Sequence, residues 1–305
     1  MELRVYGAAE VHAALPWARL ADALEAAFVA ARTEVPQRHA HALGGDGTLL
    51  LMPAWSARAI GVKLVTVMPG AAARGAGTVQ ASYLLLDRAT GVARALIDGE
   101  ALTLRRTAAA SALAARHLAR PDARRLLVVG AGRLAPWMAR AHAALRPGLT
   151  EIGVWARRSE AAEGVARELA AEGLPARAAI GLEAAVRGAD IVCCATTSTT
   201  PLVHGAWLAP GAHLDLVGGF RPEMREVDDE ALARSCIVVD TAAAQAEAGD
   251  LLQPRPAPHI AGNLADLLAG RIARPADAAA CTLFKSVGTA LEDLAAAELV
   301  LATAP

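Results

Sequence analysis

The stretch Leu126-Leu127-Val128-Val129-Gly130-Ala131-Gly132-Arg133-Leu134-Ala135 decides the fold of this chain. Its first four residues form an apolar run that is typical of a buried parallel strand. The two glycines indicate a tight turn, and residues 136–145 continue as an alanine-rich helical stretch. The stretch therefore predicts a strand, a glycine turn and a helix, in that order.

The turn has the spacing G-x-G-x-x-A, which is typical of a dinucleotide-binding turn. Gly130 would permit the sharp turn, Gly132 would let a pyrophosphate approach the backbone, and Ala135 would let helix and strand pack closely. The start of the helix would then offer free N–H groups to an anion. In a chain so rich in alanine and glycine, the same spacing also fits an ordinary strand-to-helix turn.

Short apolar runs alternate with helical stretches after this turn. We expect helices at 159–171 and from 182, and strands at 152–155, 177–180, 190–195, 213–217 and, as the last, 236–240. Strands that alternate with helices predict an α/β fold with a Rossmann-type, doubly wound parallel sheet. Residues 285–302 are expected to form one apolar helix that packs back on the first part of the chain.

The first third of the chain has a different texture. An amphipathic helix is expected after Pro16 through about Arg32, and a second helix from Glu100 to Ala119. Between them, apolar runs separated by glycine or proline predict antiparallel strands at 48–52, 61–67 and 82–86. We therefore expect two domains: a smaller mixed α+β domain for substrate binding and dimerisation, residues 1–114 with 286–305, and a dinucleotide-binding domain, residues 115–285.

Composition excludes several classes of protein. The net charge of −1 gives no reason to expect a nucleic-acid or membrane partner, and every long apolar run is interrupted by Arg, Pro or Gly. The start, Met1-Glu2-Leu3-Arg4, lacks the pattern of a secretory signal. Cysteines at 193, 194, 236 and 281 have no C-x-x-C spacing and are expected to be reduced thiols, most of them buried. We expect a cytoplasmic protein, and no His, Cys, Asp and Glu grouping has the spacing of metal ligands.

The end of the second expected strand bears on the choice of cofactor. An NAD site normally has Asp or Glu there, whereas this chain has Arg157, Arg158 and Ser159. These side chains could bind a 2′-phosphate, which predicts NADP(H), with NAD(H) as the alternative. A solvated turn in which Ser159 caps the next helix is the other interpretation. The loop Thr196-Thr197-Ser198 leaves the sheet at its carboxyl edge and could contact nicotinamide or ribose, or simply form a turn before Pro201.

Several segments, in order along nearly the whole chain, resemble the ornithine cyclodeaminase/mu-crystallin family. These segments are Pro36-Gln37-Arg38, Gly61-Val62-Lys63, Leu102-Thr103, residues 106–109, the glycine turn, and residues 195–198, 210–213, 218–226 and 284–293. The resemblance implies hydride transfer between a nicotinamide and a carbon that bears an amine or imine next to a carboxylate. It also implies a homodimer whose first domain supplies the dimer contact and most of the substrate site.

The resemblance assigns Arg38, Lys63 and Arg106 to a cationic cluster that grips the substrate carboxylate, with Lys63 as the candidate catalytic residue. From the residues alone, a lysine inside an apolar strand needs an anionic partner or a lowered pKa. Taken singly, each of the three bases is more often structural or solvated. For the cofactor, we expect contacts from Gly130, Gly132, Arg133, Leu134, Ala135, Arg157, Arg158, Ser159, Thr196, Thr197, Ser198, Thr107, Val217 and Gly218.

Departures from the family pattern bear on the reaction. The cyclodeaminase branch has a glutamate where this chain has Leu50 and an aspartate where it has Phe220. Those carboxylates suit the proton transfer of a deamination. Residues 219–226 look more like the mu-crystallin and ketimine reductase branch, which tends to use NADPH. Two further departures, Ala71 and Leu134, replace an Asn and a Gln of many relatives and concern the nicotinamide side.

We therefore predict NADPH-dependent reduction of a small cyclic imino acid, of pyrroline- or piperideine-2-carboxylate type, to the cyclic amino acid. The first alternative is ornithine cyclodeaminase activity, which releases ammonia, or another amino-acid dehydrogenase activity of the same family. A second alternative is a protein that binds NADPH and a small ligand without turnover, as the likeness to mu-crystallin permits.

Overall fold

The computed structural model describes residues 3–303, so that Met1 and Glu2 of the N-terminal expectation lie outside the described residues. The chain divides into two compact units. Unit 1 consists of residues 1–107 and 289–305, and unit 2 of residues 108–288. The sequence analysis placed these boundaries at 114/115 and 285/286.

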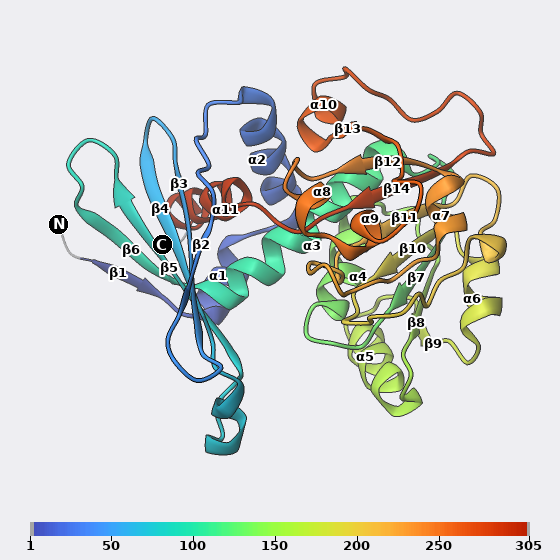
Figure 1. The fold of residues 1–305 in the computed structure, drawn as a ribbon, viewed down its shortest axis with the longest axis horizontal. Helices are drawn as coiled ribbons and strands as arrows, with labels where there is room; N and C mark the ends of the chain where they lie inside the picture. Colours follow the sequence, from blue (N-terminus) through green and yellow to red (C-terminus); the bar gives the residue numbers. More distant parts are fainter. Residues whose placement is uncertain (1–2, 304–305) are drawn as a thin grey trace. The chain divides into compact units, whose positions relative to one another are not determined.

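Unit 1 is built on a six-stranded sheet with the order β1-β6-β5-β4-β3-β2 (Figure 1). The three predicted strands, β3, β4 and β5, pair antiparallel as expected; β2 and β6 add further antiparallel pairs, and β1 pairs with β6 in parallel. The strands are β1 (Arg4–Tyr6), β2 (His39–Ala42), β3 (Thr48–Trp55), β4 (Ala59–Val67), β5 (Val79–Asp87) and β6 (Ala93–Asp98). The helices are α1 (Ala8–Ala14), α2 (Trp17–Ala30), the 3-10 helix η1 (Pro69–Arg74) and α11 (Ala290–Thr303), while α3 (Gly99–Leu118) runs from unit 1 into unit 2.

Helix α11 covers one face of the unit 1 sheet, as the red helix beside the strands in Figure 1 shows. Lys63 of β4 pairs with Tyr83 of β5, which pairs with Ile97 of β6, and residues directly opposite each other share a face. All three are buried. Gly61 lies on the same face, where a Cβ would be 3.0 Å from the Leu294 side chain of α11. The cationic Lys63 therefore lies in the hydrophobic layer between the sheet and α11.

Unit 2 contains eight parallel strands in the order β13-β12-β14-β11-β10-β7-β8-β9, which confirms the predicted parallel sheet. The strands are β7 (Arg125–Val129), β8 (Glu151–Trp155), β9 (Ala176–Ala178), β10 (Ile191–Cys194), β11 (His213–Leu216), β12 (Ser235–Val239), β13 (Ile260–Asn263) and β14 (Cys281–Lys285). The chain order reverses between β7 and β10, and ligands of such sheets bind outside the carboxyl ends of the strands at this point.

Helices and 3-10 turns connect these strands. They are α4 (Ala135–Leu145), α5 (Ser159–Ala171), α6 (Leu182–Gly188), η2 (Gly205–Trp207), α7 (Asp229–Ala233), α8 (Ala244–Glu247), α9 (Gly249–Leu252) and α10 (Leu264–Leu268). The core of the sheet is made by its strand residues, of which Leu127, Val192 and Leu214 are almost completely buried.

The end of the chain differs from the prediction. The expected C-terminal helix is present as α11 but begins at Ala290 and not at Lys285, and residues 281–285 form an additional strand, β14, between β11 and β12. A short apolar run such as Leu283-Phe284 does not by itself separate a buried strand from a helix. Gly288 lies between β14 and α11, and its φ of +80° is outside the helical range, so α11 cannot extend back through it. Strand β13 was also missed, so residues 236–240 do not contain the last strand.

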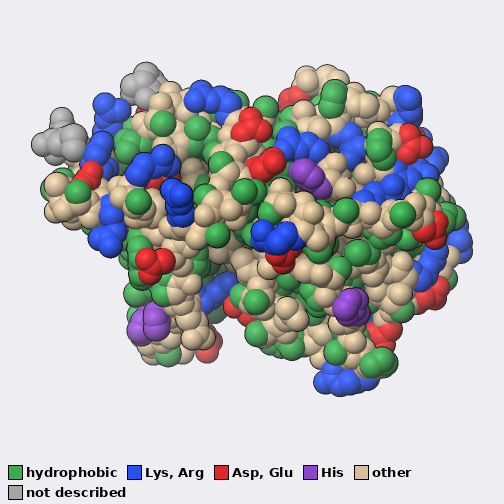
Figure 2. All heavy atoms as spheres, turned by 90° about the horizontal axis from the view of Figure 1, so that it is seen from above, with side chains coloured by type: hydrophobic (Ala, Val, Ile, Leu, Met, Phe, Trp, Pro, Cys, Tyr) green, Lys and Arg blue, Asp and Glu red, His purple; other side chains and the backbone are tan. Residues whose placement is uncertain are grey.

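The charged side chains on the surface are of both signs, as the net charge of −1 leads us to expect. On the face drawn in Figure 2, acidic and basic side chains both occur, separated by hydrophobic and uncoloured surface. None of the helices within residues 3–303 combines the length and the hydropathy that crossing a bilayer requires.

Candidate active site

The glycine turn after β7 has the shape that its spacing predicted. Gly130 has a φ of +126°, and a Cβ there would lie 2.5 Å from the carbonyl oxygen of Ala195. By contrast, no atom lies within 4 Å of the position that a Cβ on Gly132 would take. Leu134 is the N-cap of α4, and Ala135 is buried at its first position. The turn thus leaves open space over Gly132 next to the helix N-terminus, which fits a pyrophosphate.

The loop after β8 exposes the two arginines that bear on the cofactor. Arg157, Arg158 and Ser159 all lie on the surface. Arg158 is the N-cap of α5 and Ser159 is its first helical residue, so the capping role considered for Ser159 is not observed. Both guanidinium groups are placed beyond the carboxyl end of β8, where the 2′ position of an adenosine ribose lies in folds of this type.

The loops after β10 and β11 meet at a buried carboxylate, Glu226. Its Oε1 accepts hydrogen bonds from the N–H of Thr196 (2.8 Å) and from the Thr196 hydroxyl (2.9 Å). Its Oε2 accepts from the N–H groups of Gly218 (2.9 Å) and Gly219 (3.1 Å). Glu226 lies inside a family segment, but no role could be assigned to it from the sequence, because nothing in the spacing shows that two distant loops converge on it.

A second buried acid, Asp250, and a buried lysine, Lys285, hold Glu226 in place. Asp250 accepts from the N–H groups of Glu226 (2.8 Å) and Val227 (3.2 Å), and Lys285 donates to its Oδ2 (2.9 Å). Lys285 lies 3.9 Å from Glu226 Oε2, and all three ionisable side chains are fully buried. Burial raises the pKa of Glu226 to about 7, although Lys285 opposes the shift.

The remaining residues that are expected to contact the cofactor differ in their exposure to solvent and in their hydrogen bonds. The Ser198 hydroxyl donates to the carbonyl of Thr200 (2.7 Å), which is the turn-forming role considered for this loop. Thr197 is exposed, Val217 is buried directly after β11, and Arg133 is exposed in the glycine turn. Thr107 is buried in α3 as the last residue of the first segment of unit 1. Their contacts with a cofactor stay predictions.

In unit 1, Lys63 and Arg106 are joined by two carboxylates of α11. Lys63 Nζ lies 2.7 Å from Asp293 Oδ2, and Arg106 Nε donates to Asp293 Oδ1 (2.9 Å). Arg106 Nη1 also donates to Glu292 Oε2 (2.6 Å). The expected anionic partner of Lys63 is therefore present. Both acids lie in the family segment at the C-terminal end of the chain, but the sequence analysis did not connect them with Lys63.

Burial and the neighbouring charges shift the pKa values of the side chains in this buried group. Burial lowers the pKa of Lys63 to about 8, although Asp293 opposes the shift. Burial alone would raise the pKa of Asp293, but Lys63 and Arg106 outweigh it and hold this pKa below its ordinary value. Arg106 has a raised pKa, because its two carboxylates outweigh burial, and it stays charged. Lys63 is thus the titratable cation of the group.

Arg38 is the third member of the expected cationic cluster. It lies one residue before β2 and is half-buried. Extending the register of β2 and β3 by one residue sets it opposite Met52, which in turn pairs with Lys63. Its grouping with Lys63 and Arg106 stays a prediction. Leu50, which replaces the cyclodeaminase glutamate, pairs with Val65 and so shares the face of Lys63.

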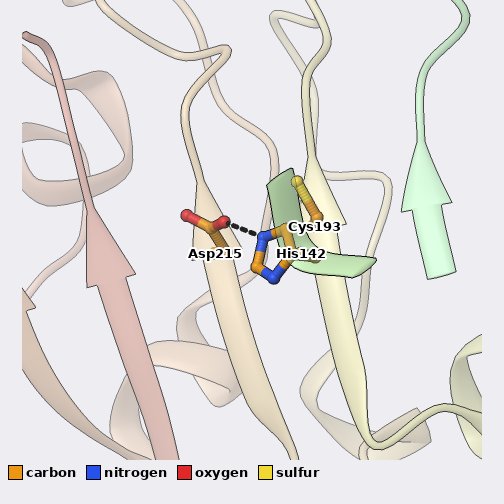
Figure 3. A group of neighbouring side chains, drawn as sticks. All are labelled: His142, Cys193 and Asp215. Atoms are coloured by element: carbon orange, nitrogen blue, oxygen red, sulfur yellow. Dashed lines mark hydrogen bonds and ion pairs between the residues drawn. The ribbon is translucent and has the colours of Figure 1, made fainter. Parts of the chain in front are cut away.

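Unit 2 also contains a group of three buried side chains of types that bind metals (Figure 3). His142 of α4, Cys193 of β10 and Asp215 of β11 place their ligand atoms within 4.8 Å of one another. Sequence spacing could not reveal this group because its members come from three separate elements. His142 Nε2 is 2.9 Å from Asp215 Oδ2, and burial raises the pKa of the Cys193 thiol, so we assign no metal here. His213 Nδ1 nearby is hydrogen-bonded to the Thr282 hydroxyl (2.9 Å).

The sequence model of the ornithine cyclodeaminase/mu-crystallin family matches residues 1–304. The chain belongs to this family. It is 39% identical over 261 residues to the Delta(1)-pyrroline-2-carboxylate reductase of Paracoccus denitrificans, with 83% of each chain covered. It is 37% identical over 260 residues to the ketimine reductase mu-crystallin of Rattus norvegicus, with 83% of this chain and 80% of the relative covered.

Solved structures agree with this family membership. A Delta(1)-pyrroline-2-carboxylate reductase from Thermococcus litoralis, in complex with NADH and L-proline, matches with a TM-score of 0.92 and 30% identity over 99% of this chain and 97% of its own. An archaeal alanine dehydrogenase dimer with bound NAD matches with a TM-score of 0.91 and 27% identity over 100% and 96%. These likenesses confirm the family and the Rossmann-type fold that the sequence predicted.

Proposed function

We propose that this family member reduces a small cyclic imino acid, of pyrroline- or piperideine-2-carboxylate type, to the cyclic amino acid with NADPH. A hydride adds to the imine carbon and a proton adds to the imine nitrogen, so that NADPH and H⁺ are consumed and NADP⁺ is released. The observation that carries the proposal is the buried pair Lys63 and Arg106, placed inside an apolar layer of a chain whose relatives are named for imine reduction.

Lys63, Arg106 and Arg38 are proposed to bind the substrate carboxylate. Asp293 and Glu292 hold the first two cations in place, so that a carboxylate meets preorganised charges. Fixing the carboxylate also fixes the adjacent imine carbon, and positioning of this kind accounts for much of the rate of such reactions. Lys63 is the proposed proton donor to the imine nitrogen, because a pKa of about 8 allows it to give up a proton near neutral pH.

NADPH supplies the hydride when it is bound, and the residues of the turn fit it. The open space over Gly132 and the N-terminus of α4 are proposed to hold the pyrophosphate. Arg157 and Arg158 are proposed to bind the 2′-phosphate, which favours NADP(H) over NAD(H).

A double substitution tests the cofactor preference. Replacing Arg157 and Arg158 with Ser should lower the ratio of kcat/KM for NADPH to that for NADH by about tenfold or more, since two charge-assisted contacts are lost. The control is Arg167→Ser in α5, which removes an exposed arginine paired with Glu163 and should leave the ratio unchanged. Equal ratios in all three proteins would refute the role of the two arginines.

A panel of substrates tests the reaction itself. The purified protein is mixed with each of the two cyclic imines, or with ornithine, and with NADPH, NADH, NADP⁺ or NAD⁺, and reduced cofactor and ammonia are measured. Oxidation of NADPH by a cyclic imine supports the proposal. Release of ammonia from ornithine with NAD⁺, without oxidation of NADPH by either imine, would identify a cyclodeaminase instead. Binding of NADPH without any turnover would identify a binding protein.

We also propose that the protein is a cytoplasmic homodimer. Val5, Val62, Leu84 and Leu96 share the sheet face opposite Lys63, and Val5 is 65% and Leu96 36% exposed. A second copy would cover this apolar face, as contiguous exposed apolar surface of this kind marks an interface. The four cysteines are free thiols, which suits a reducing compartment.

A further inference from the structure

The carboxylate of Glu226 connects two loops at the carboxyl edge of the unit 2 sheet. Thr196 follows β10, and Gly218 and Gly219 follow β11. Each oxygen of Glu226 accepts two hydrogen bonds, one pair from Thr196 and one pair from the two glycines. All four contacts lie between 2.8 and 3.1 Å. The ionised carboxylate is the form that accepts all four donors at once.

The two loops approach each other so closely that side chains are excluded between them. A Cβ on Gly218 would lie 2.0 Å from the carbonyl oxygen of Thr196 and 2.3 Å from its nitrogen. A Cβ on Gly219 would lie 2.6 Å from Asp250 Oδ2. The backbones of the two loops are therefore in close contact, and Glu226 fixes the position of both loops by accepting hydrogen bonds from each.

The support of Glu226 reaches a third strand. Lys285, the last residue of β14, donates to Asp250, and Asp250 accepts from the backbone N–H of Glu226. The group thus joins the carboxyl ends of β10, β11 and β14, which are adjacent in the sheet. With β12 and β13, these strands form the part of the sheet that does not carry the glycine turn or Arg157. In a Rossmann-type sheet, this part lies next to the nicotinamide end of the dinucleotide.

We propose that Glu226 is a positioning residue for hydride transfer, which holds the loops Thr196–Ser198 and Gly218–Gly219 in the shape that seats the nicotinamide. This inference rests on the proposed function, because it assigns Glu226 to the hydride step of that reaction. Glu226 touches neither substrate nor cofactor in this role. It acts through the backbone of the two loops, and Asp250 and Lys285 hold it in place.

The principal test is Glu226→Gln. The Gln side chain has one oxygen and one NH₂ group. The oxygen can still accept from one loop, but the NH₂ group cannot accept the hydrogen bonds that the other loop donates. We expect kcat to fall about tenfold to hundredfold, since small displacements of reacting groups have effects of this size. KM for the imino acid should stay within twofold, because unit 1 grips the carboxylate. The kinetic isotope effect with NADPH deuterated at the transferred position should rise, as hydride transfer becomes more rate-limiting.

The matched control is Asp190→Asn at the opposite edge of the same sheet. Asp190 Oδ2 accepts from the backbone N–H groups of Arg124 (2.9 Å) and Arg125 (3.0 Å), at the start of β7. Both Asp190→Asn and Glu226→Gln should lower Tm, because each weakens hydrogen bonds that a carboxylate accepts from backbone N–H groups, but Asp190→Asn should leave kcat and the isotope effect unchanged. Thr196→Val, which removes one of the four bonds, should lower kcat severalfold, and Thr196→Ser should restore it.

Two results would overturn the inference. One is a folded Glu226→Gln protein whose kcat and isotope effect stay within twofold of the original. The other is an Asp190→Asn protein that loses as much activity. If the unaltered protein turns over no imino acid, the proposed function fails, and the emission of bound NADPH tests the inference separately. Glu226→Gln should then change the nicotinamide emission and Asp190→Asn should not, and unchanged emission in both would refute it.

Discussion

Burial of Lys63 gives this residue an unusual dependence on pH. Its pKa is about 8 in the fold, compared with an ordinary value of 10.5. Between these values the unfolded chain keeps a proton that the folded chain has lost, so this residue adds stability as pH rises through the window. The cation that is proposed to bind the substrate carboxylate, however, disappears over the same window. Stability and ligand binding are therefore expected to respond to alkaline pH in opposite directions.

The binding of a ring carboxylate without a basic nitrogen, tetrahydrofuran-2-carboxylate, tests this expectation. Its affinity should fall progressively above pH 8 by about tenfold per pH unit, because the ligand itself does not titrate there and Lys63 does. Calorimetric titration from pH 6 to about 10 gives the profile. In the control, Lys63→Arg, the cation persists to high pH and the alkaline decline should vanish. A decline that survives this substitution would exclude Lys63 as its source.

Asp293 offers a second test at this scale. Asp293→Asn leaves two buried cations with one carboxylate, and we expect the free energy of unfolding to fall by about 3–5 kcal/mol, as when a buried ion pair is broken. The control in the same helix is Glu298→Gln, whose partner Arg58 is 82% exposed, and it should cost about 1 kcal/mol or less. Chemical denaturation measures both. Equal losses in the two variants would contradict the importance assigned to the buried group.

At the level of elements, the two glycines of the turn after β7 have different tasks. Gly130→Ala should reduce the stability of the protein, because the residue has a positive φ and a Cβ would meet the carbonyl of Ala195. Gly132→Ala should leave Tm within a few degrees, since nothing lies near the new methyl group. It should nevertheless weaken NADPH binding tenfold or more by filling the space of the pyrophosphate. Thermal melts and NADPH titrations separate the two effects, and tight binding by Gly132→Ala would rule out this placement.

Elements with strong local signals were predictable from the sequence. The run before Gly130 and the alternation after it identified the parallel sheet, and the antiparallel strands of unit 1 followed from their turns. Strand β14 was missed because its apolar run is short and is buried on both faces. The pairing and register of the strands could not be predicted from local patterns. The most important consequence is that Lys63 lies on the sheet face that α11 covers.

The same limit applies to the candidate site. Lys63 and the glycine turn stand out in the sequence because a charge in an apolar strand and a G-x-G spacing are local features. Glu226 and Asp293 do not, since their partners Gly218, Thr196 and Lys63 approach them only through tertiary contacts. An acid near the end of a chain looks like any solvated helix residue until the fold shows it to be buried.

On the scale of the whole molecule, the apolar face of the unit 1 sheet is expected to control association. Replacing Leu96 with Glu places a charge in the proposed interface, where Leu96 is 36% exposed in the single chain. The dimer should dissociate at least about a hundredfold more readily, because the charge must be buried without a partner. Ile180→Glu is the control, since that side chain is fully exposed in unit 2. Light scattering during size-exclusion chromatography measures the mass, and a dimeric Leu96→Glu protein would refute this interface.

Unit 1 is assembled from two segments separated by the whole of unit 2. During synthesis, the strands with Lys63 and Arg106 emerge long before Asp293 and Glu292 of α11. Until then the two cations and the apolar side chains around Tyr83 have no helix to cover them, whereas unit 2 already has all of its strands. A purified fragment that ends at residue 288 should therefore show a protease-sensitive first segment beside a resistant unit 2, whereas both units of the full chain should resist the protease. The ribosome thus finishes the unit proposed to bind the cofactor before the unit proposed to bind the substrate can be completed by α11.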